Sequence, residues 1–330
     1  MLFRNGENLK KELIQYLTGK QKITIIVPYI KAPMLASLLK TPNLKCDQII
    51  VRWEARDLIT GASDLDIYNI CKENGIYLYM NNRIHLKLYT NNFKDAFLGS
   101  ANISERAIST EKYHFNYEVC TYVNLIDRSD RLYLHKILND SILINDEIFK
   151  SIEDQIPNID LNIENNLFDL PMTDKKNDSD FLISKLPMID TPNLLWELYS
   201  GKIKTESEVQ ENCLCHDLTL YTVQPEINSK NDFLEILSKN FFDHSFISSF
   251  LLAVDTAPSK KMRNGRTKEG LQFGAVTRWF TENTTTAPTP KPFELQKNVQ
   301  ILYVWIEYLS KGKYSIIVPG RHSQVLKKNF

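Results

Sequence analysis

Two short segments decide how this chain is interpreted: Ile84-His85-Leu86-Lys87-Leu88-Tyr89 and Phe97-Leu98-Gly99-Ser100-Ala101-Asn102. Side chains alternate between the two faces of a strand, so His85 and Lys87 are predicted to project together while their apolar neighbours face the core. The second segment ends a short apolar run, and Ser104-Glu105-Arg106 after it is typical of the first turn of a helix. The loop between them is therefore expected to present polar side chains and backbone N–H groups to an anion.

The residue types in these segments suit attack on a phosphodiester. An imidazole can attack phosphorus, while an ammonium and amide donors hold the charge on the non-bridging oxygens. His85 alone would be interpreted as an ordinary histidine. Its combination with Lys87 and with the Gly-Ser-x-Asn run from Gly99 to Asn102 is far more specific.

The first 125 residues, which contain both segments, predict alternating helices and strands. The expected elements are a helix ending at Gly19, a strand over 23–30, a short helix over 34–39, a strand over 48–53, a helix over 63–75, and strands over 76–80, 83–89 and 96–98. Continuous apolar runs such as 23–30 are typical of strands buried on both faces. This order predicts an α/β layered sandwich.

The length of 330 residues favours two domains. Acidic residues and asparagines accumulate between about 146 and 180, first as a helical pattern and then as a polar linker, which places the boundary near residue 180. In the second half, apolar runs rich in aromatic and β-branched residues are separated by turn signals and favour a mainly-β, barrel-like domain. These runs are 218–223, 246–254, 271–280, 299–308 and 314–318.

Composition excludes several classes of protein. Hydrophobic residues make up 43% and charged residues 24%, which is ordinary for a globular chain and not for a disordered or collagen-like one. Forty Lys and Arg balance forty Asp and Glu, but residues 1–180 carry 22 against 25 (net −3) and residues 181–330 carry 18 against 15 (net +3). No signal sequence or membrane-spanning run is recognised, and five scattered cysteines fit a reducing compartment, so we expect a cytoplasmic protein. The run Cys213-Leu214-Cys215-His216 lacks a second ligand pair at finger spacing, so no metal site is expected.

With these residues in place, the chain resembles the phospholipase D superfamily over residues 1 to about 125. His85-x-Lys87 with Gly99-Ser100-x-Asn102 matches the signature H-x-K-x4-D-x6-G-S-x-N, and Asn116-Tyr117-Glu118 resembles the N-x-E of its nuclease members. The sequence departs from the signature at its Asp, which falls on Asn92; Asp95 stands three residues later.

The resemblance implies a role for each matching residue. His85 would be the nucleophile that forms a phosphohistidine, Lys87 and Asn102 would bind the non-bridging oxygens, Ser100 would support them, and Glu118 would orient the imidazole. His114 is a weaker candidate for a second base. The scheme requires no metal and no other cofactor. It does require two histidines in one site, and this chain has one motif and no internal repeat, so a homodimer with a shared site is expected.

The order of the two halves resembles restriction endonucleases of the BfiI and NgoFVII kind, which join such a catalytic domain to a DNA-reading domain that is B3-like where its fold is known. The predicted partner is then double-stranded DNA, with a separate ATPase or helicase-like subunit and a cognate methyltransferase as further candidates and no membrane. We name as DNA-binding candidates the basic cluster (Lys260, Lys261, Arg263, Arg266, Lys268 and Arg278) and the pair Lys202 and Lys204. Two alternatives stay open: a nuclease with little sequence preference, and a DNA-binding protein that uses the catalytic fold only to dimerise.

Overall fold

The computed structural model describes residues 1–109, 115–158, 167–170, 185–223, 227–257, 260–261, 267–268, 271, 273–283, 292–318 and 324–329. The chain forms two compact units, Met1–Met172 and Thr173–Phe330, and each is described by itself. The predicted boundary near residue 180 falls in 171–184, outside the described residues.

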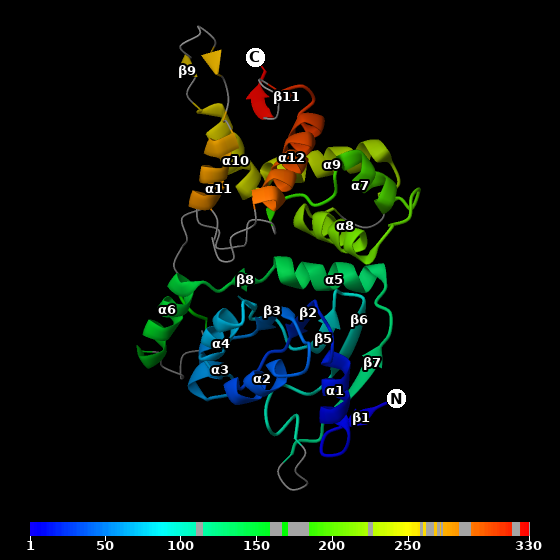
Figure 1. The fold of residues 1–330 in the computed structure, drawn as a ribbon, viewed down its shortest axis with the longest axis vertical. Coiled ribbons are helices and arrows are strands. Elements are labelled where there is room, and N and C mark those ends of the chain that lie inside the picture. Colours follow the sequence, from blue (N-terminus) through cyan, green and yellow to red (C-terminus); the bar gives the residue numbers. More distant parts are fainter. Residues whose placement is uncertain are drawn as a thin grey trace. The chain divides into compact units, whose positions relative to one another are not determined.

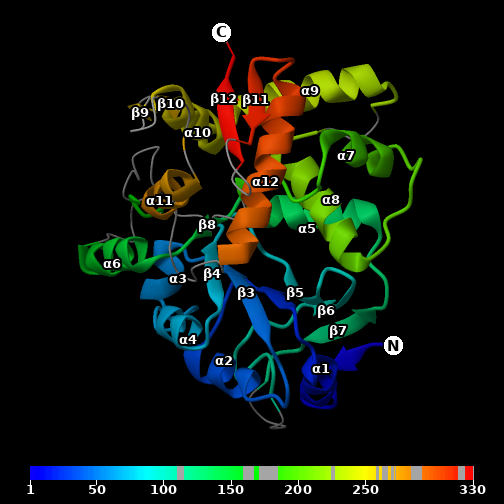
Figure 2. The same cartoon turned by 45° about the horizontal axis from the view of Figure 1, so that its top comes forward.

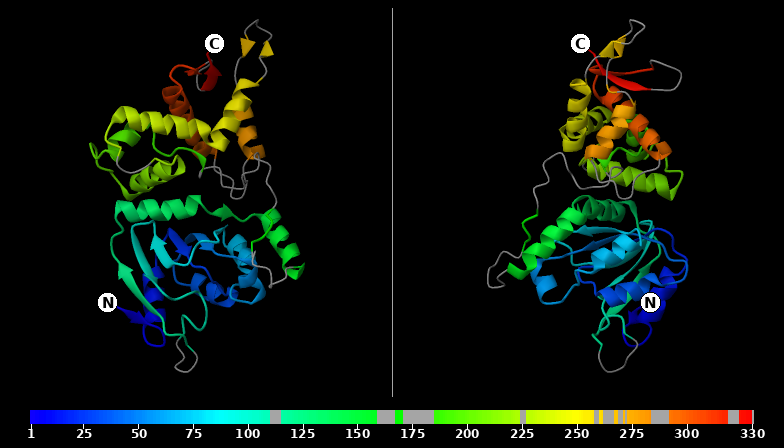
Figure 3. Two further views of the ribbon diagram at one scale, coloured as in Figure 1. Left: turned by 180° about the vertical axis from the view of Figure 1, so that it is seen from behind. Right: turned by 60° about the vertical axis from the view of Figure 1, so that its left-hand side comes forward.

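The first unit is built on a mixed sheet, and its described strands follow the order β1-β7-β6-β5-β2-β3-β4-β8 (Figures 1 and 2). The strands are β1 (Phe3–Arg4), β2 (Ile23–Ile26), β3 (Cys46–Val51), β4 (Tyr77–Met80), β5 (Lys87–Asn91), β6 (Asp95–Gly99), β7 (Val119–Val123) and β8 (Ile142–Leu143). β2, β3 and β4 are parallel neighbours, whereas β5, β6 and β7 follow as an antiparallel series beside β2. β1, the outermost strand on the side of the sheet that carries the N-terminus, pairs with β7 (Figure 3).

This topology gathers many strand ends at one edge of the sheet. The carboxyl ends of the parallel strands β2 and β3 meet there with the amino end of β5, because β5 runs antiparallel to β2. The carboxyl end of β6 and the amino end of β7 lie at the same edge for the same reason. Loops that follow or precede these five strands therefore converge, although they come from distant parts of the sequence.

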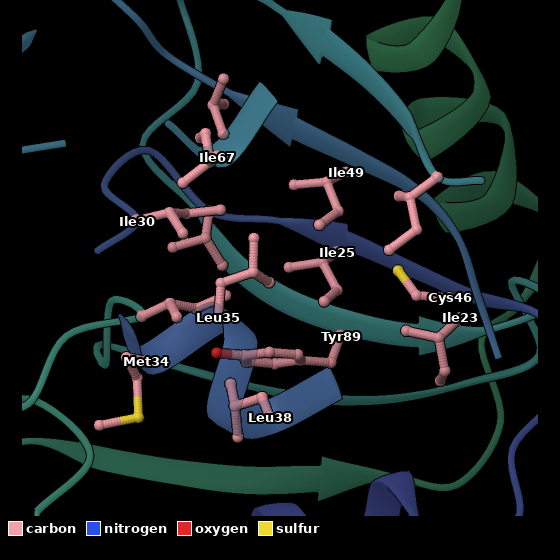
Figure 4. Close-up of a cluster of buried hydrophobic side chains, with 14 of the residues drawn as sticks. Ile23, Ile25, Ile30, Met34, Leu35, Leu38, Cys46, Ile49, Ile67 and Tyr89 are labelled. Atoms are coloured by element: carbon pink, nitrogen blue, oxygen red, sulfur yellow. The ribbon is translucent and has the colours of Figure 1, made fainter. Parts of the chain in front are cut away.

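Helices cover the sheet on both faces. In the first unit they are α1 (Leu9–Leu17), α2 (Ala32–Leu39), α3 (Ala55–Ile59), α4 (Ile67–Glu73), α5 (Arg128–Asn139) and α6 (Asp146–Gln155), followed by the short 3-10 turn η1 (Ile156–Asn158). Side chains from α1, α2, α4 and α6 pack on alternate residues of the strands, including Ile23, Ile25 and Ile49 (Figure 4). Ile26, of opposite parity in β2, is also fully buried, so both faces of this strand are covered.

The predicted α/β sandwich is confirmed for the first unit. The helices predicted to end at Gly19 and Gly75 end two residues before them, at Leu17 and Glu73, and the second begins at Ile67 instead of residue 63. These glycines have φ of +74° and +66°, the left-handed conformation that commonly follows a helix. The sequence did not predict α3. The helical pattern predicted for the first part of the acidic segment is confirmed by α6, whose Ile148 and Ile152 are buried in the core of the first unit.

The second unit is mainly helical in its described residues, so the predicted mainly-β, B3-like barrel is wrong there. Its helices are α7 (Pro192–Tyr199), α8 (Glu208–Leu220), α9 (Lys230–Asp243), α10 (Ser245–Asp255), α11 (Phe273–Asn283) and α12 (Pro292–Leu309). Two small antiparallel pairs accompany them: β9 (Lys260–Lys261) with β10 (Thr267–Lys268), and β11 (Tyr314–Ile317) with β12 (Val325–Lys328). Of the predicted strands, only 314–318 is a strand; 246–254, 271–280 and 299–308 lie in helices and 218–223 contains the end of one.

The reason for this error is visible in α10. Its buried residues Phe246, Ile247, Phe250, Leu251 and Val254 recur at spacings of three and four, the period of a helix. Aromatic and β-branched side chains are favoured in strands because they pack well on a half-buried surface. Burial against a neighbouring element stabilises them in a helix as well. In α10, the spacing of the apolar residues therefore predicts the structure better than their residue types do.

Two buried polar groups tie the second unit together. The carboxylate of Asp217, which is fully buried in α8, accepts hydrogen bonds from the backbone N–H groups of Met188 and Ile189 and lies 2.9 Å from Nδ1 of His216. Trp305 of α12 donates its indole N–H to the carbonyl of Ile189 at 2.7 Å. His216 is therefore a partner of Asp217 in the core of this unit.

No helix of the described residues has the length and apolar character needed to cross a membrane.

Candidate active site

The three sequence motifs meet at the convergent edge of the sheet. Lys87 pairs with Gly99 across β5 and β6, and Gly99 pairs with Cys120 across β6 and β7. His85 stands two residues before β5, so the predicted strand over 83–89 begins later than expected, at Lys87. Ser100 comes directly after β6 and Glu118 directly before β7. The His-x-Lys, Gly-Ser-x-Asn and Asn-x-Glu runs are therefore neighbours in space.

The His85 side chain is exposed, whereas Lys87 is only 8% exposed. The Lys87 ammonium donates a hydrogen bond to the backbone carbonyl of His85 at 2.7 Å, which ties the two candidate residues together. Burial lowers the pKa of Lys87, an effect that the nearby carboxylate of Glu118 opposes and the positive charge of Arg52 reinforces. A partly desolvated ammonium beside an exposed imidazole suits the binding of an anionic substrate.

A pH profile tests the state of Lys87. Because its pKa is lowered from the usual 10.5, the ammonium loses its proton at lower pH than an ordinary lysine, and cleavage is expected to decline on the alkaline side below that value. Lys87→Arg keeps its charge throughout this range, so its alkaline decline should move to higher pH even though its maximum rate is reduced. The measurement is kcat/KM against pH for both proteins. An identical alkaline decline in the two would show that another group titrates there.

Ser100 positions the Glu118 carboxylate. The Ser100 hydroxyl donates a short hydrogen bond to Glu118 and accepts one from the backbone N–H of Val119 at 3.1 Å. Among the described residues, no hydrogen bond joins Glu118 to the imidazole of His85, so the predicted orienting contact is not made within this chain. Glu118 instead acts on Lys87 through its charge.

Gly99 has no room for a side chain. A Cβ atom at this position would lie 2.1 Å from the carbonyl oxygen of Val119 and 2.6 Å from both Cα and Sγ of Cys120. The close approach lets the Val119 carbonyl accept a hydrogen bond from the N–H of Ser100 at 3.0 Å. The glycine of the Gly-Ser-x-Asn run is thus required by strand packing.

The loop after Asn102 is organised differently from the prediction. Ser104 begins a single turn, closed by the N–H groups of Ala107 and Ile108, but no helix follows in the described residues, so the predicted helix N-terminus is wrong. Just after this turn, the backbone N–H of Ser109 donates to the side-chain oxygen of Asn5 at 2.8 Å.

Asn5 is a structural residue that the sequence did not indicate. It is 4% exposed, and its side-chain N–H groups donate to the carbonyls of Arg106 and Asn116 at 2.6 and 3.1 Å. Its backbone N–H donates to the carbonyl of Glu118 at 3.0 Å. One buried amide therefore fixes both ends of the loop that carries the Asn-x-Glu run.

A second unpredicted group lies at the carboxyl end of β3. The Arg52 guanidinium makes two hydrogen bonds to Asp57, at 2.8 and 2.6 Å, and donates to the hydroxyl of Tyr29 at 2.6 Å. The next residue, Trp53, is buried at φ +40°, a left-handed conformation that costs a non-glycine residue about 1–2 kcal/mol. The surrounding packing thus holds a strained backbone beside the site.

The acidic position of the signature has a purely structural setting here. Asn92 has φ +54° in the turn between β5 and β6. Asp95 accepts a hydrogen bond from Tyr16 of α1 at 2.6 Å and lies 3.4 Å from the ammonium of Lys20. In the ladder Asp95 pairs with Asn91, four residues along the strand from Gly99, so it lies at the far end of the hairpin from Ser100.

The basic candidates lie in the second unit. Lys260 and Lys261 form β9, and Lys268 of β10 pairs directly with Lys260, so the basic cluster includes a hairpin. Arg278 lies on α11, where a strand was predicted, and is exposed. Arg263, Arg266 and His114 are outside the described residues. Lys202 and Lys204 are exposed after α7.

No protein-family model matches this chain, and no curated protein matches it. Several solved structures are similar. NucT from Helicobacter pylori matches with 20% identity and a TM-score of 0.35 over 44% of this chain and 98% of its own. The phospholipase D family member Nuc from Salmonella typhimurium matches with 16% identity and a TM-score of 0.34 over the same shares.

Phosphatidylserine synthase from Haemophilus influenzae matches with 14% identity and a TM-score of 0.34, over 52% of this chain and 45% of its own.

Proposed function

We propose that this protein is a phosphodiesterase of the phospholipase D kind that cleaves DNA through a covalent intermediate on His85. The observation that carries the proposal is the register at one sheet edge, where three sequence-distant motifs become neighbours: Lys87 opposite Gly99, and Gly99 opposite Cys120. The arrangement supplies an exposed imidazole, a buried ammonium and amide groups. These are the groups that phosphoryl transfer through a nucleophilic side chain needs.

The proposed reaction has two steps. In the first, a nitrogen of His85 forms a bond to phosphorus, the bond from phosphorus to the leaving oxygen breaks, and that oxygen takes a proton from a second imidazole. In the second, water attacks phosphorus and gives a proton back to the second imidazole while the phosphorus–nitrogen bond breaks. Lys87 and Asn102 would hold the non-bridging oxygens throughout. Because these two side chains would stabilise the negative charge on the non-bridging oxygens, the scheme requires no metal.

The second imidazole would be His85 of the partner subunit in a homodimer, because one chain supplies one such motif. Mixing tests this. If each reaction needs both histidines, co-refolding wild type with a ninefold excess of His85→Ala protein should lower activity per wild-type subunit about tenfold, since most wild-type chains then pair with a variant. Sedimentation of the wild type should give a dimer. Undiminished activity per wild-type subunit would show that each chain works alone.

The proposed substrate is double-stranded DNA cut at specific sites, as in a restriction system. Support for a nucleic-acid partner comes from the β9–β10 hairpin, where lysines of the basic cluster are brought opposite one another. A separate ATPase or helicase-like subunit and a cognate methyltransferase would be the partners of such an enzyme. Site specificity would have to come from a helical second unit.

The decisive experiment is cleavage of a mixed-sequence plasmid in excess EDTA, with the His85→Ala protein purified in parallel. Discrete fragments from the wild type and none from the variant are expected for a metal-independent, site-specific endonuclease. A smear that is lost in the variant would instead favour a nuclease with little sequence preference. If neither protein cleaves and the wild type binds DNA, two explanations are left: the reaction needs the ATPase partner, or the catalytic fold serves only for dimerisation and binding.

A further inference from the structure

An open cavity of about 530 Å³ adjoins the candidate active site in the first unit. Two of its lining residues, Asn102 and Asn116, belong to the sequence motifs, and the others come from the segment after β2, the loop between α3 and α4, and the turn at Ser104. Pockets of about 300–1,000 Å³ commonly hold small organic ligands. The cavity is therefore large enough for more than a phosphate group.

Four of the residues that line the cavity are aromatic or apolar: Tyr29, Pro33, Met34 and Ala62. The ring of Tyr29 is held in place by Arg52, whose guanidinium lies 4.9 Å from the ring centre and donates to the hydroxyl. A fixed aromatic ring with apolar residues in the same lining favours a flat, uncharged group.

The charges around the cavity do not favour a second phosphate. Lys31 is paired with Asp64 through a short contact and also donates to the carbonyl of Gly61 at 3.1 Å, so its charge is already compensated. Arg106 and Glu105 both line the cavity and carry opposite charges. The occupant expected from this balance is neutral and polar.

Asn102 adds a specific requirement. Its side-chain oxygen is buried and accepts no hydrogen bond in the described residues, which is costly unless a ligand or water supplies a donor. A phosphodiester has no hydrogen to donate, whereas the N–H groups of a nucleobase and the hydroxyl groups of a sugar do. The hydroxyl of Ser104 and the amide of Asn116 line the same cavity and can pair with the remaining polar edge.

We propose that this cavity binds the nucleoside attached to the scissile phosphate, with its base against Tyr29 and a donor directed to Asn102. This inference rests on the proposed function. A base can enter such a cavity only when it is unstacked from its neighbours, so the strand in the site would be single-stranded or locally opened. Preference for a nucleoside on the phosphodiester is then a property of the first unit.

Two chromogenic esters test the cavity in the full chain: the para-nitrophenyl ester of thymidine monophosphate, in its two positional isomers, and bis(para-nitrophenyl) phosphate, which has no nucleoside. Ala62→Phe fills the cavity from a partly exposed loop, and Ala62→Ser is the matched control. We expect Ala62→Phe to lower the ratio of kcat/KM for one thymidine ester over the diaryl ester by at least about tenfold, and Ala62→Ser to change it less than about twofold. Circular dichroism checks that the variants fold.

The outcomes separate the inference from the proposed function. An unchanged ratio in Ala62→Phe would overturn the cavity as the nucleoside site, while loss of all hydrolysis in His85→Ala would still support the reaction. If His85→Ala hydrolyses the esters as well as the wild type, the proposed function fails. Calorimetric binding of thymidine monophosphate then decides the inference by itself: binding that is lost in Ala62→Phe supports it, and equal or absent binding overturns it.

Discussion

His85→Ala is expected to lower DNA cleavage by at least about 10⁴-fold while leaving DNA binding intact. The imidazole is the proposed nucleophile, and its exposed side chain makes no hydrogen bond to other described residues that would support the fold. The measurement is the single-turnover rate on a labelled plasmid. Binding is followed by a gel-shift assay on the same DNA.

Two controls separate loss of the nucleophile from loss of structure. Free imidazole added to the His85→Ala protein is expected to restore part of the rate, because it fills the space that the side chain vacates. Wild-type protein quenched during turnover should carry labelled phosphate that is stable in alkali and lost in acid, as a phosphoramidate bond is. A variant that retains more than a tenth of the activity would contradict the proposed chemistry.

Gly99→Ala is expected to destabilise the first unit by about 3 kcal/mol or more. The added methyl group would have to displace the carbonyl of Val119 and the backbone of Cys120, because it would lie 2.1 and 2.6 Å from them. Backbone in a sheet cannot yield as a flexible side chain does, so pairing between β6 and β7 must open. The expected result is a lower urea midpoint and faster hydrogen exchange in both strands.

The matched control for this variant is Gly274→Ala. Gly274 lies in α11, and a Cβ atom there meets nothing within 4 Å. Alanine stabilises a helix more than glycine does, so this variant should have the stability of the wild type or be more stable by up to about 1 kcal/mol. If both variants unfold at the wild-type urea midpoint, the close packing at Gly99 does not contribute to the free energy of unfolding.

The first unit could be predicted largely from its sequence because its signals are local. Continuous apolar runs such as Ile23–Ile26 indicated buried strands, and Gly19 and Gly75 indicated where helices end. The chemical motifs were readable for the same reason, since the parity of a strand and the spacing of a turn are set by neighbouring residues. The roles of His85, Lys87 and Asn102 remain predictions until the variants are tested.

The missing parts depend on contacts between residues far apart in the sequence. Nothing near Asn5 indicates that it bonds to Arg106 and Asn116, and nothing near Asp95 indicates Tyr16. In the second unit, residue type and the spacing of the apolar residues favour different structures, and only the spacing matches the helices. The sequence also did not indicate the cavity beside Asn102, because residues from four separate segments line it.

The four hydrogen bonds of Asn5 have a consequence for folding kinetics. They join residues about a hundred positions apart, at separations of 101 and 111 for the two side-chain donors. Contacts of such sequence separation carry a large loop-closure entropy and form slowly, after local helices and hairpins. During refolding, most secondary structure should therefore return before the loop that carries Glu118 is closed. Enzymatic activity is expected to reappear in a later kinetic phase than the circular dichroism signal.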